Sequence, residues 1–153
     1  MEYAIVLLPL LGSFISGFFG KLIGTRLSQA ITTSFVSISS ILSLFIFYDV
    51  ITNDYSSNKT VFTWISSGNF VVNWSIYIDT LTSVMLVVVS FVSSIIHYYS
   101  IGYMDHDPHK TRFMSYLSLF TFSMLTLVTA DNFLQLFFGW EGVGLCSYLL
   151  IGF

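Results

Sequence analysis

The sequence predicts an all-α integral membrane protein of about five transmembrane helices, with a small β-hairpin between the second and the third. Of its 153 residues, 55% are hydrophobic and only 8% are charged, whereas soluble domains carry roughly 25% charged residues. The 5 basic and 8 acidic side chains also leave five long apolar stretches between them. A soluble domain of this size needs a charged surface, and 13 charged residues are too few to provide it. Most of the outer surface is therefore expected to face lipid.

Each of the five stretches is long enough to cross a bilayer as a helix. A hydrocarbon core of roughly 30 Å takes about 17 to 25 helical residues. Helices are expected because lipid offers no partner for backbone N–H and C=O groups, and these runs do not alternate as barrel strands do. The expected spans are residues 3–19, 27–48, 80–101, 113–130 and 132–153.

The segment between the second and third spans predicts a β-hairpin at about residues 61–78. Residues 70–78 alternate with a period of two, and residues 66–69, Ser-Ser-Gly-Asn, provide a turn after the apolar run 61–65. An isolated hairpin is marginally stable in water, so we expect it to dock on another part of the chain. The alternative is a disordered loop with aromatic membrane anchors.

The basic residues predict the orientation. Lys21 and Arg26 lie in the first loop and Lys110 and Arg112 in the third, whereas the second loop has only Lys59. The positive-inside bias places the first and third loops in the cytoplasm, and the N-terminus and hairpin outside it. The expected location is the inner (cytoplasmic) membrane of a cell, or the mitochondrial inner membrane. Scattered basic residues form no patch for nucleic acid, so none is expected as a partner.

Two local patterns concern helix packing and helix ends. Small residues recur every four positions in and just after the first span, and such a stripe lets membrane helices approach closely. Its members are Gly12, Ser16, Gly20 and Gly24. Asp79 and Asp131 stand just before the third and fifth spans, where a carboxylate can accept hydrogen bonds from free backbone N–H groups. Both are expected to be N-caps.

Glu141 is the one formally charged residue inside any expected span. It lies about 14 Å along the fifth span, close to the bilayer midplane. An acidic residue there costs roughly 2.5 to 3.5 kcal/mol, so it normally faces protein or water and marks an ion or proton path. Its protonation state can be switched by whatever moves beside it. Gly139, Gly142 and Gly144 are interpreted as leaving space beside the carboxylate for a partner helix or water. The alternative is a protonated acid that only ties two helices together by a hydrogen bond.

The other candidate residues carry weaker signals. His97 is followed by Tyr98 and Tyr99 near the end of the third span, which favours an interfacial residue over a proton carrier. Residues 105–109, Asp-His-Asp-Pro-His, fit a solvated loop better than a metal site, and no metal site is predicted. Cys146 is the single cysteine, which excludes an internal disulfide and a multi-cysteine iron–sulfur site.

Residues 140–144, Trp-Glu-Gly-Val-Gly, followed by Ser-Tyr-Leu-Leu-Ile-Gly at 147–152, closely resemble the L subunit of bacterial NADH:quinone oxidoreductase, which corresponds to subunit 5 of the mitochondrial complex. The likeness extends through residues 99–104 and 79–82 to Trp64. The resemblance implies an antiporter-like membrane-arm subunit taking part in proton translocation coupled to NADH oxidation and quinone reduction.

The resemblance also implies roles and partners. It makes Glu141 a proton-transfer residue that pairs with a lysine on a later helix, with Trp140, Gly142 and Gly144 as its helix environment. The partners are other membrane-arm subunits and the lipid bilayer. No cofactor is expected in this chain, because NADH, flavin, iron–sulfur clusters and quinone belong to other subunits.

By this resemblance, residues 1–130 form the N-terminal helices with the hairpin, and residues 131–153 begin the antiporter-like proton-conducting domain. Family members continue for hundreds of residues, and none of the five expected spans contains a lysine. The chain alone is therefore expected not to pump. Two alternatives remain: a subunit of a multisubunit Mrp-type cation/proton antiporter, and a non-functional truncated membrane protein.

Overall fold

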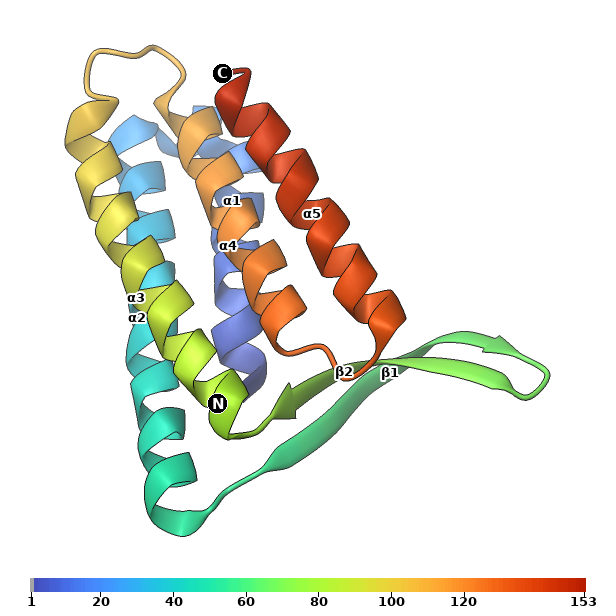
Figure 1. Ribbon diagram of the computed structural model, residues 1–153. Coiled ribbons are helices and arrows are strands. Elements are labelled where there is room, and N and C mark those ends of the chain that lie inside the picture. Colours follow the sequence, from blue (N-terminus) through green and yellow to red (C-terminus); the bar gives the residue numbers. More distant parts are fainter. Residues whose placement is uncertain (1) are drawn as a thin grey trace.

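The computed structural model describes residues 2–153, which form five helices and a two-stranded antiparallel sheet (Figure 1). The all-α membrane class and the hairpin between the second and third helices are confirmed. The elements are α1 Glu2–Ile23, α2 Thr25–Asn53, β1 Ser57–Ser67, β2 Phe70–Ile78, α3 Thr80–Tyr103, α4 Lys110–Val128 and α5 Phe133–Ile151.

Helices α1 to α4 form a bundle, and α5 packs on the outside of α4 (Figure 1). The start of α1, the hairpin and the α4–α5 turn lie together at what we call the hairpin end. The α1–α2 turn, the α3–α4 loop and the C-terminus lie at the opposite end. Helix α4 contacts α1, α2, α3 and α5, which makes it the central helix.

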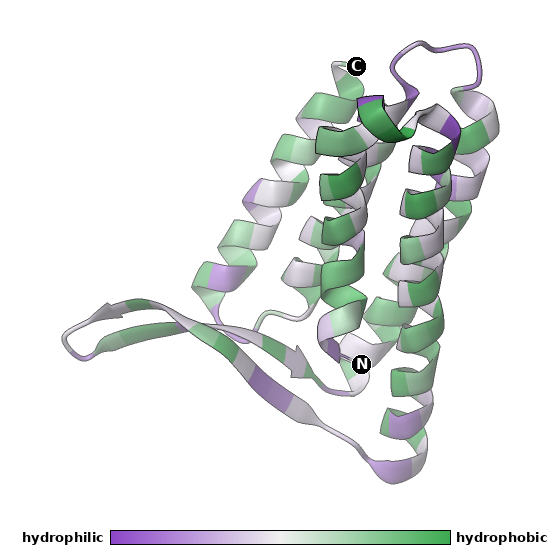
Figure 2. Ribbon diagram, turned by 180° about the vertical axis from the view of Figure 1, so that it is seen from behind, coloured by the Kyte–Doolittle hydropathy of each residue, from purple (hydrophilic) through white to green (hydrophobic). Residues whose placement is uncertain are grey.

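Helices α1, α2, α3 and α5 are long and apolar enough to cross a membrane. Helix α4 is less apolar, because its first turn contains Lys110 and Arg112 and hydroxyl residues follow among its apolar ones. Of these, Ser118, Thr121 and Thr126 are buried. A helix surrounded by other helices does not need a fully apolar surface. Hydrophobic residues dominate the helices in Figure 2, whereas the α3–α4 loop is hydrophilic.

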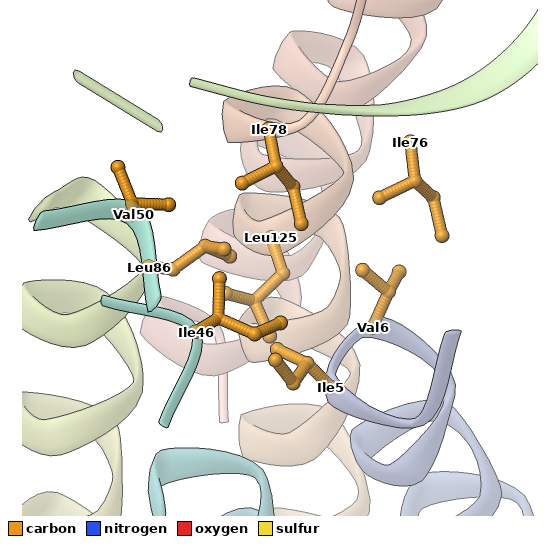
Figure 3. Close-up of a cluster of buried hydrophobic side chains, with 8 residues drawn as sticks. All are labelled: Ile5, Val6, Ile46, Val50, Ile76, Ile78, Leu86 and Leu125. Carbon is orange, nitrogen blue, oxygen red and sulfur yellow. The ribbon is translucent and has the colours of Figure 1, made fainter. Parts of the chain in front are cut away.

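The hairpin end has an apolar core to which the hairpin itself contributes. Eight buried side chains from α1, α2, β2, α3 and α4 meet there (Figure 3): Ile5, Val6, Ile46, Val50, Ile76, Ile78, Leu86 and Leu125. Ile76 and Ile78 come from β2, so one end of this strand is part of the bundle core. Burial of these side chains is the main force that holds the hairpin against the helices.

The small-residue stripe of α1 packs against two helices, as predicted. A Cβ atom on Gly12 would lie 3.4 Å from the Phe35 ring of α2, and one on Gly20 would lie 3.0 Å from Thr111 of α4. Ser16 between them hydrogen-bonds to Ser28 at 2.6 Å. Gly24 instead forms the α1–α2 turn with a φ of +98°, a conformation that glycine adopts without strain.

The two predicted helix caps differ in outcome. The Asp79 carboxylate accepts a hydrogen bond from the Thr82 backbone N–H at 2.8 Å, so this cap is confirmed. The prediction for Asp131 is wrong, because α5 begins one residue later than such a cap requires. Asn132 caps the helix by accepting from the Gln135 backbone N–H at 2.8 Å. Asn and Asp cap helices about equally well, so local sequence could not separate the two positions.

Candidate functional site

Helix α5 is positioned by the hairpin, which docks on it as predicted. The Gln135 side chain is fully buried and binds both backbone groups of Ser75 in β2, accepting from its N–H at 3.0 Å and donating to its C=O at 2.8 Å. The Tyr77 N–H donates to the C=O of Thr129 at the end of α4, at 2.9 Å. The amide of Gln135 thus acts as a short extension of the sheet.

Aromatic side chains extend this contact along the first turns of α5. The Phe138 ring lies edge-on to Trp74 and Trp64 of the hairpin, with ring centroids 4.8 Å and 5.9 Å away. The Asn132 side chain also donates to the C=O of Asn73 at 2.8 Å. Such aromatic pairs add about 0.5 to 1.5 kcal/mol each beyond their burial. The start of α5 is therefore fixed to the hairpin on one side and to α4 on the other.

The face of α5 that meets α4 is lined by residues spaced four, three and four apart: Gln135, Gly139, Gly142 and Cys146. A Cβ on Gly139 would lie 2.7 Å from the Leu127 Cα of α4, and one on Gly142 would lie 2.8 Å from the Ser123 hydroxyl. These two glycines therefore let α5 approach α4 closely. Of the two predicted occupants, a partner helix or water, these glycines admit a partner helix, α4, on a face turned away from Glu141.

Glu141 is the ninth of the 19 residues of α5 and is exposed. Helical geometry turns it about 100° from Gly142 and about 200° from Gly139, so it points away from α4. Among residues 2–153, no hydrogen bond or ion pair engages its carboxylate. Trp140 and Gly144 share this outward side. Trp140 has 62% of its surface exposed, and a Cβ atom added to Gly144 would have no neighbour within 4 Å.

His97 contradicts its predicted interfacial position. The imidazole is fully buried between α3 and α4, with Nε2 3.0 Å from the Ser118 hydroxyl and Nδ1 2.7 Å from the Ser93 carbonyl oxygen. Helix α3 continues to Tyr103, so His97 lies inside the helix, on the side opposite the exposed Tyr98 and Tyr99. The spacing of polar residues at 90, 94, 97 and 100 marks a buried face and could have revealed this placement.

Sequence reasoning missed a buried carboxylate at the hairpin end. Glu2 has 3% of its surface exposed and accepts hydrogen bonds from the hydroxyls of Tyr55 and Ser57. Its Oε2 also lies 3.1 Å from the ammonium of Lys59 on β1. This hydrogen bond and the negative charge of Glu2 raise the pKa of Lys59. No local pattern pairs residues this far apart in the chain.

The titratable side chains of the described residues do not form a metal site. Within residues 2–153, no three His, Cys, Asp or Glu side chains are grouped so that they could hold a metal ion. In the α3–α4 loop, Asp105 instead forms an exposed ion pair with Lys110 at 3.4 Å. Glu141 is thus the candidate that combines an ionisable group with the middle of a membrane-spanning helix.

The fold and this site define a polytopic membrane protein with a hydroxyl-rich bundle interior and a carboxylate midway along its last described helix. The sequence profile of the family described as NADH-Ubiquinone oxidoreductase (complex I), chain 5 N-terminus matches residues 64–114. Curated relatives match almost the whole chain. The chain therefore belongs to the family of NADH-ubiquinone oxidoreductase chain 5 and NADH-quinone oxidoreductase subunit L.

Three relatives illustrate the match. The subunit L of Rickettsia felis is 58% identical over 149 residues, which is 97% of this chain. Chain 5 of Arabidopsis thaliana is 58% identical and chain 5 of Trichophyton rubrum is 54% identical, each over all 153 residues. The chain spans 23% of the length of each of these relatives. Since all carry respiratory names, the Mrp-type alternative is not favoured.

Proposed function

We propose that this chain contributes to proton translocation coupled to NADH oxidation and quinone reduction, as part of an antiporter-like subunit of the respiratory membrane arm. Glu141 is the proposed proton-transferring side chain. The observation that carries the proposal is a carboxylate in the middle of a spanning helix, on the side that the other four helices leave open. The names of the relatives supply the reaction to which this side chain would be coupled.

The position of Glu141 argues against contact with lipid in the working protein. A charged carboxylate at the centre of a membrane helix costs roughly 2.5 to 3.5 kcal/mol when it faces hydrocarbon. The polar side chains of α5 that form hydrogen bonds face α4 or the hairpin, as Gln135 does. The open side of α5 therefore fits a protein surface or a water path, and the family resemblance implies a lysine on a later helix at that place.

The charges at the two ends support the proposed orientation. Lys21, Arg26, Lys110 and Arg112 all lie at the end opposite the hairpin, whereas Lys59 alone lies on the hairpin. The positive-inside bias then places the hairpin and the N-terminus on the extracytoplasmic side. The membrane would be the bacterial inner membrane or the mitochondrial inner membrane. The proposed partners are other membrane-arm subunits, which together with the rest of the complex would carry the NADH, flavin, iron–sulfur and quinone sites.

The substitution Glu141→Gln tests the proposal, because glutamine keeps the size of the side chain but cannot release or take up a proton. In the native chain assembled in its respiratory membrane, we expect proton pumping driven by NADH to fall at least about tenfold, since a positioned proton carrier contributes about that much or more. Glu141→Asp retains a carboxyl group and should retain part of the rate.

Asp131→Asn is the matched control, since it removes an exposed carboxylate at the α4–α5 turn, outside the helix. This control should pump normally. Pumping that is unchanged in Glu141→Gln would remove the assigned role, and an equal loss in Asp131→Asn would show that net charge rather than position matters.

A further inference from the structure

The interface of α3 and α4 contains a chain of hydrogen-bonding side chains around His97. Ser118 lies 3.0 Å from Nε2 of the imidazole. On the other side, the Ser93 hydroxyl lies 3.5 Å from Nδ1 and hydrogen-bonds to the hydroxyl of Thr121. His97 and Ser118 are fully buried, and Thr121 is 1% exposed. Ser93 is partly buried. Each buried polar group must be desolvated, so each needs a hydrogen-bond partner inside the bundle.

The donors in this chain all point the same way. Thr121 donates to the Leu117 carbonyl at 3.0 Å, so Ser93 is the donor in its pair with Thr121. The Nδ1–H of His97 donates to the Ser93 carbonyl at 2.7 Å, which leaves Nε2 to accept from the Ser118 hydroxyl. Ser118 therefore donates to His97, and the Ser93 hydroxyl donates to Thr121. Between them, the Nδ1–H of His97 donates to the Ser93 carbonyl oxygen, with the Ser93 hydroxyl 3.5 Å from Nδ1.

One end of the chain lines a cavity, and the other end lies one helical turn from a cleft. A polar cleft of about 640 Å³ lies between α1 and α4 at the end opposite the hairpin, and its lining includes Ser115. Ser115 lies one helical turn from Ser118, on the same side of α4. A second cavity of about 420 Å³ lies between α3, α4 and α5, and Ser93, Thr121 and Ser147 line it. Three hydroxyls are enough to hold a water molecule in an otherwise apolar space.

We propose that Ser118, His97, Ser93 and Thr121 form a proton relay through the α3–α4 interface, which joins the cleft between α1 and α4 to the cavity beside α5. The proposal rests on the proposed function and places the relay in series with Glu141, so that the loss of either should reduce pumping. His97 is the member that can hold an added proton, and the three hydroxyls pass protons to and from it.

Each transfer through the relay conserves protons. A proton reaches the Ser118 oxygen from the cleft side as the hydroxyl hydrogen of Ser118 moves to Nε2, which gives an imidazolium. A small turn of the ring then moves the Nδ1 hydrogen from the Ser93 carbonyl oxygen toward the Ser93 hydroxyl, which lies 3.5 Å from Nδ1. The Nδ1 hydrogen passes to the hydroxyl oxygen of Ser93, the Ser93 hydrogen passes to Thr121, and the Thr121 hydrogen passes to water in the cavity. One proton enters and one leaves. Rotation of the hydroxyls and the ring restores the starting arrangement.

His97→Gln is the main test, because glutamine can hydrogen-bond on both sides but cannot accept a proton. In the native assembled complex, we expect NADH oxidation by an artificial electron acceptor to stay unchanged, which shows normal assembly. Pumping per assembled complex should fall at least about tenfold, and its slowing in heavy water should increase. Ser118→Ala should act in the same direction, and it decides the outcome if His97→Gln fails to assemble.

Ser43→Ala is the matched control, because Ser43 is a fully buried serine that hydrogen-bonds across α2 and α3 to Ser90, at 2.8 Å, outside the relay. It should pump normally. Normal pumping in His97→Gln and Ser118→Ala, or an equal loss in Ser43→Ala, would overturn the relay. Glu141→Gln is measured in parallel: if it abolishes pumping while the relay variants pump normally, only the relay fails, and if it has no effect, the proposed function fails.

Discussion

The interior of the α1–α4 bundle and the outward side of α5 handle polar groups in opposite ways. In the bundle, buried hydroxyls donate to carbonyls of their own helix or to side chains across an interface, as Ser43 does with Ser90. On α5, the carboxylate of Glu141 has no partner within residues 2–153. A satisfied hydroxyl needs only a structural explanation, whereas a carboxylate without a partner on the outward side of a membrane helix calls for a polar neighbour in the working protein.

Two kinds of contact hold α5 against the rest of the protein. Gly139 and Gly142 let the backbones of α5 and α4 meet, and Gln135 ties α5 to the hairpin. The contact at the two glycines depends on the absence of side chains, and the contact at Gln135 depends on a pair of hydrogen bonds. Breaking each in turn shows how firmly the open side of α5, and Glu141 with it, is held in position.

The largest effect is expected from Gly139→Leu. Even a Cβ atom would lie 2.7 Å from the Leu127 Cα, and backbone cannot move aside as a side chain can. Overpacking of this kind costs about 3 kcal/mol or more, so α5 should separate from α4. The buried thiol of Cys146 reports this directly, because it should react with a thiol-specific dye in detergent at a lower temperature.

Gly144→Leu is the control, because nothing lies within 4 Å of a Cβ at this position. It adds the same side chain to the same helix and should leave the reactivity of Cys146 nearly unchanged. Equal shifts in both variants would mean that helix propensity rather than contact with α4 controls the docking of α5.

The next effect concerns Gln135→Leu, which removes both hydrogen bonds to Ser75 and leaves a buried N–H and C=O without partners. The cost should be about 2 kcal/mol, since each unsatisfied buried group costs roughly 1 to 3 kcal/mol and local rearrangement recovers part of it. Hydrogen exchange of the Ser75 amide should accelerate.

Gln29→Leu provides the comparison within the bundle. The Nε2 group of Gln29 is buried without a hydrogen-bond partner, so replacing this side chain should cost little or should stabilise the protein. Comparing the two buried glutamines then separates the contribution of the Gln135 hydrogen bonds to stability from the contribution of its side-chain volume. A similar loss of stability in both variants would contradict the view that the amide of Gln135 extends the sheet.

Local pattern was enough to predict the spans and the hairpin. Uninterrupted apolar runs and a period of two are properties of contiguous residues, and they set the helices and the strands within a few positions. Partners far apart in the chain were not predictable. Nothing near Gln135 indicates that it binds Ser75, and nothing near Glu2 indicates Lys59.

The candidate site shows the same limit. The depth of Glu141 follows from counting along α5, but its direction depends on which face of the helix meets α4. The predicted room for a partner helix exists at Gly139 and Gly142, but the helix that they admit is α4, on a face turned away from Glu141. For His97, the neighbouring tyrosines suggested an interface, whereas the spacing of buried polar residues along α3 was the better guide.

The smallest effect is expected at the hairpin end, where Lys59→Met removes the ion pair with Glu2. The Lys59 ammonium is solvent-exposed, so the loss of stability should be small. Its pH dependence has a definite sign. The hydrogen bond and charge of Glu2 raise the pKa of Lys59 above the ordinary value of 10.5, so the contribution is fully present below that pH and disappears as the pH rises through the folded-state value.

The measurement is the difference in unfolding temperature between the native chain and Lys59→Met, followed by tryptophan fluorescence from about pH 8 to about pH 12. Taking the difference cancels groups that titrate in both proteins. The difference should be constant at first and then close in the upper part of this range. In Lys59→Arg the tie to Glu2 should survive the whole range, because a guanidinium stays charged there. The Lys59 ammonium lies 5.8 Å from the centroid of the Tyr3 ring. If the difference in unfolding temperature does not change with pH, Lys59 acts through packing of its alkyl chain on Tyr3 rather than through its charge.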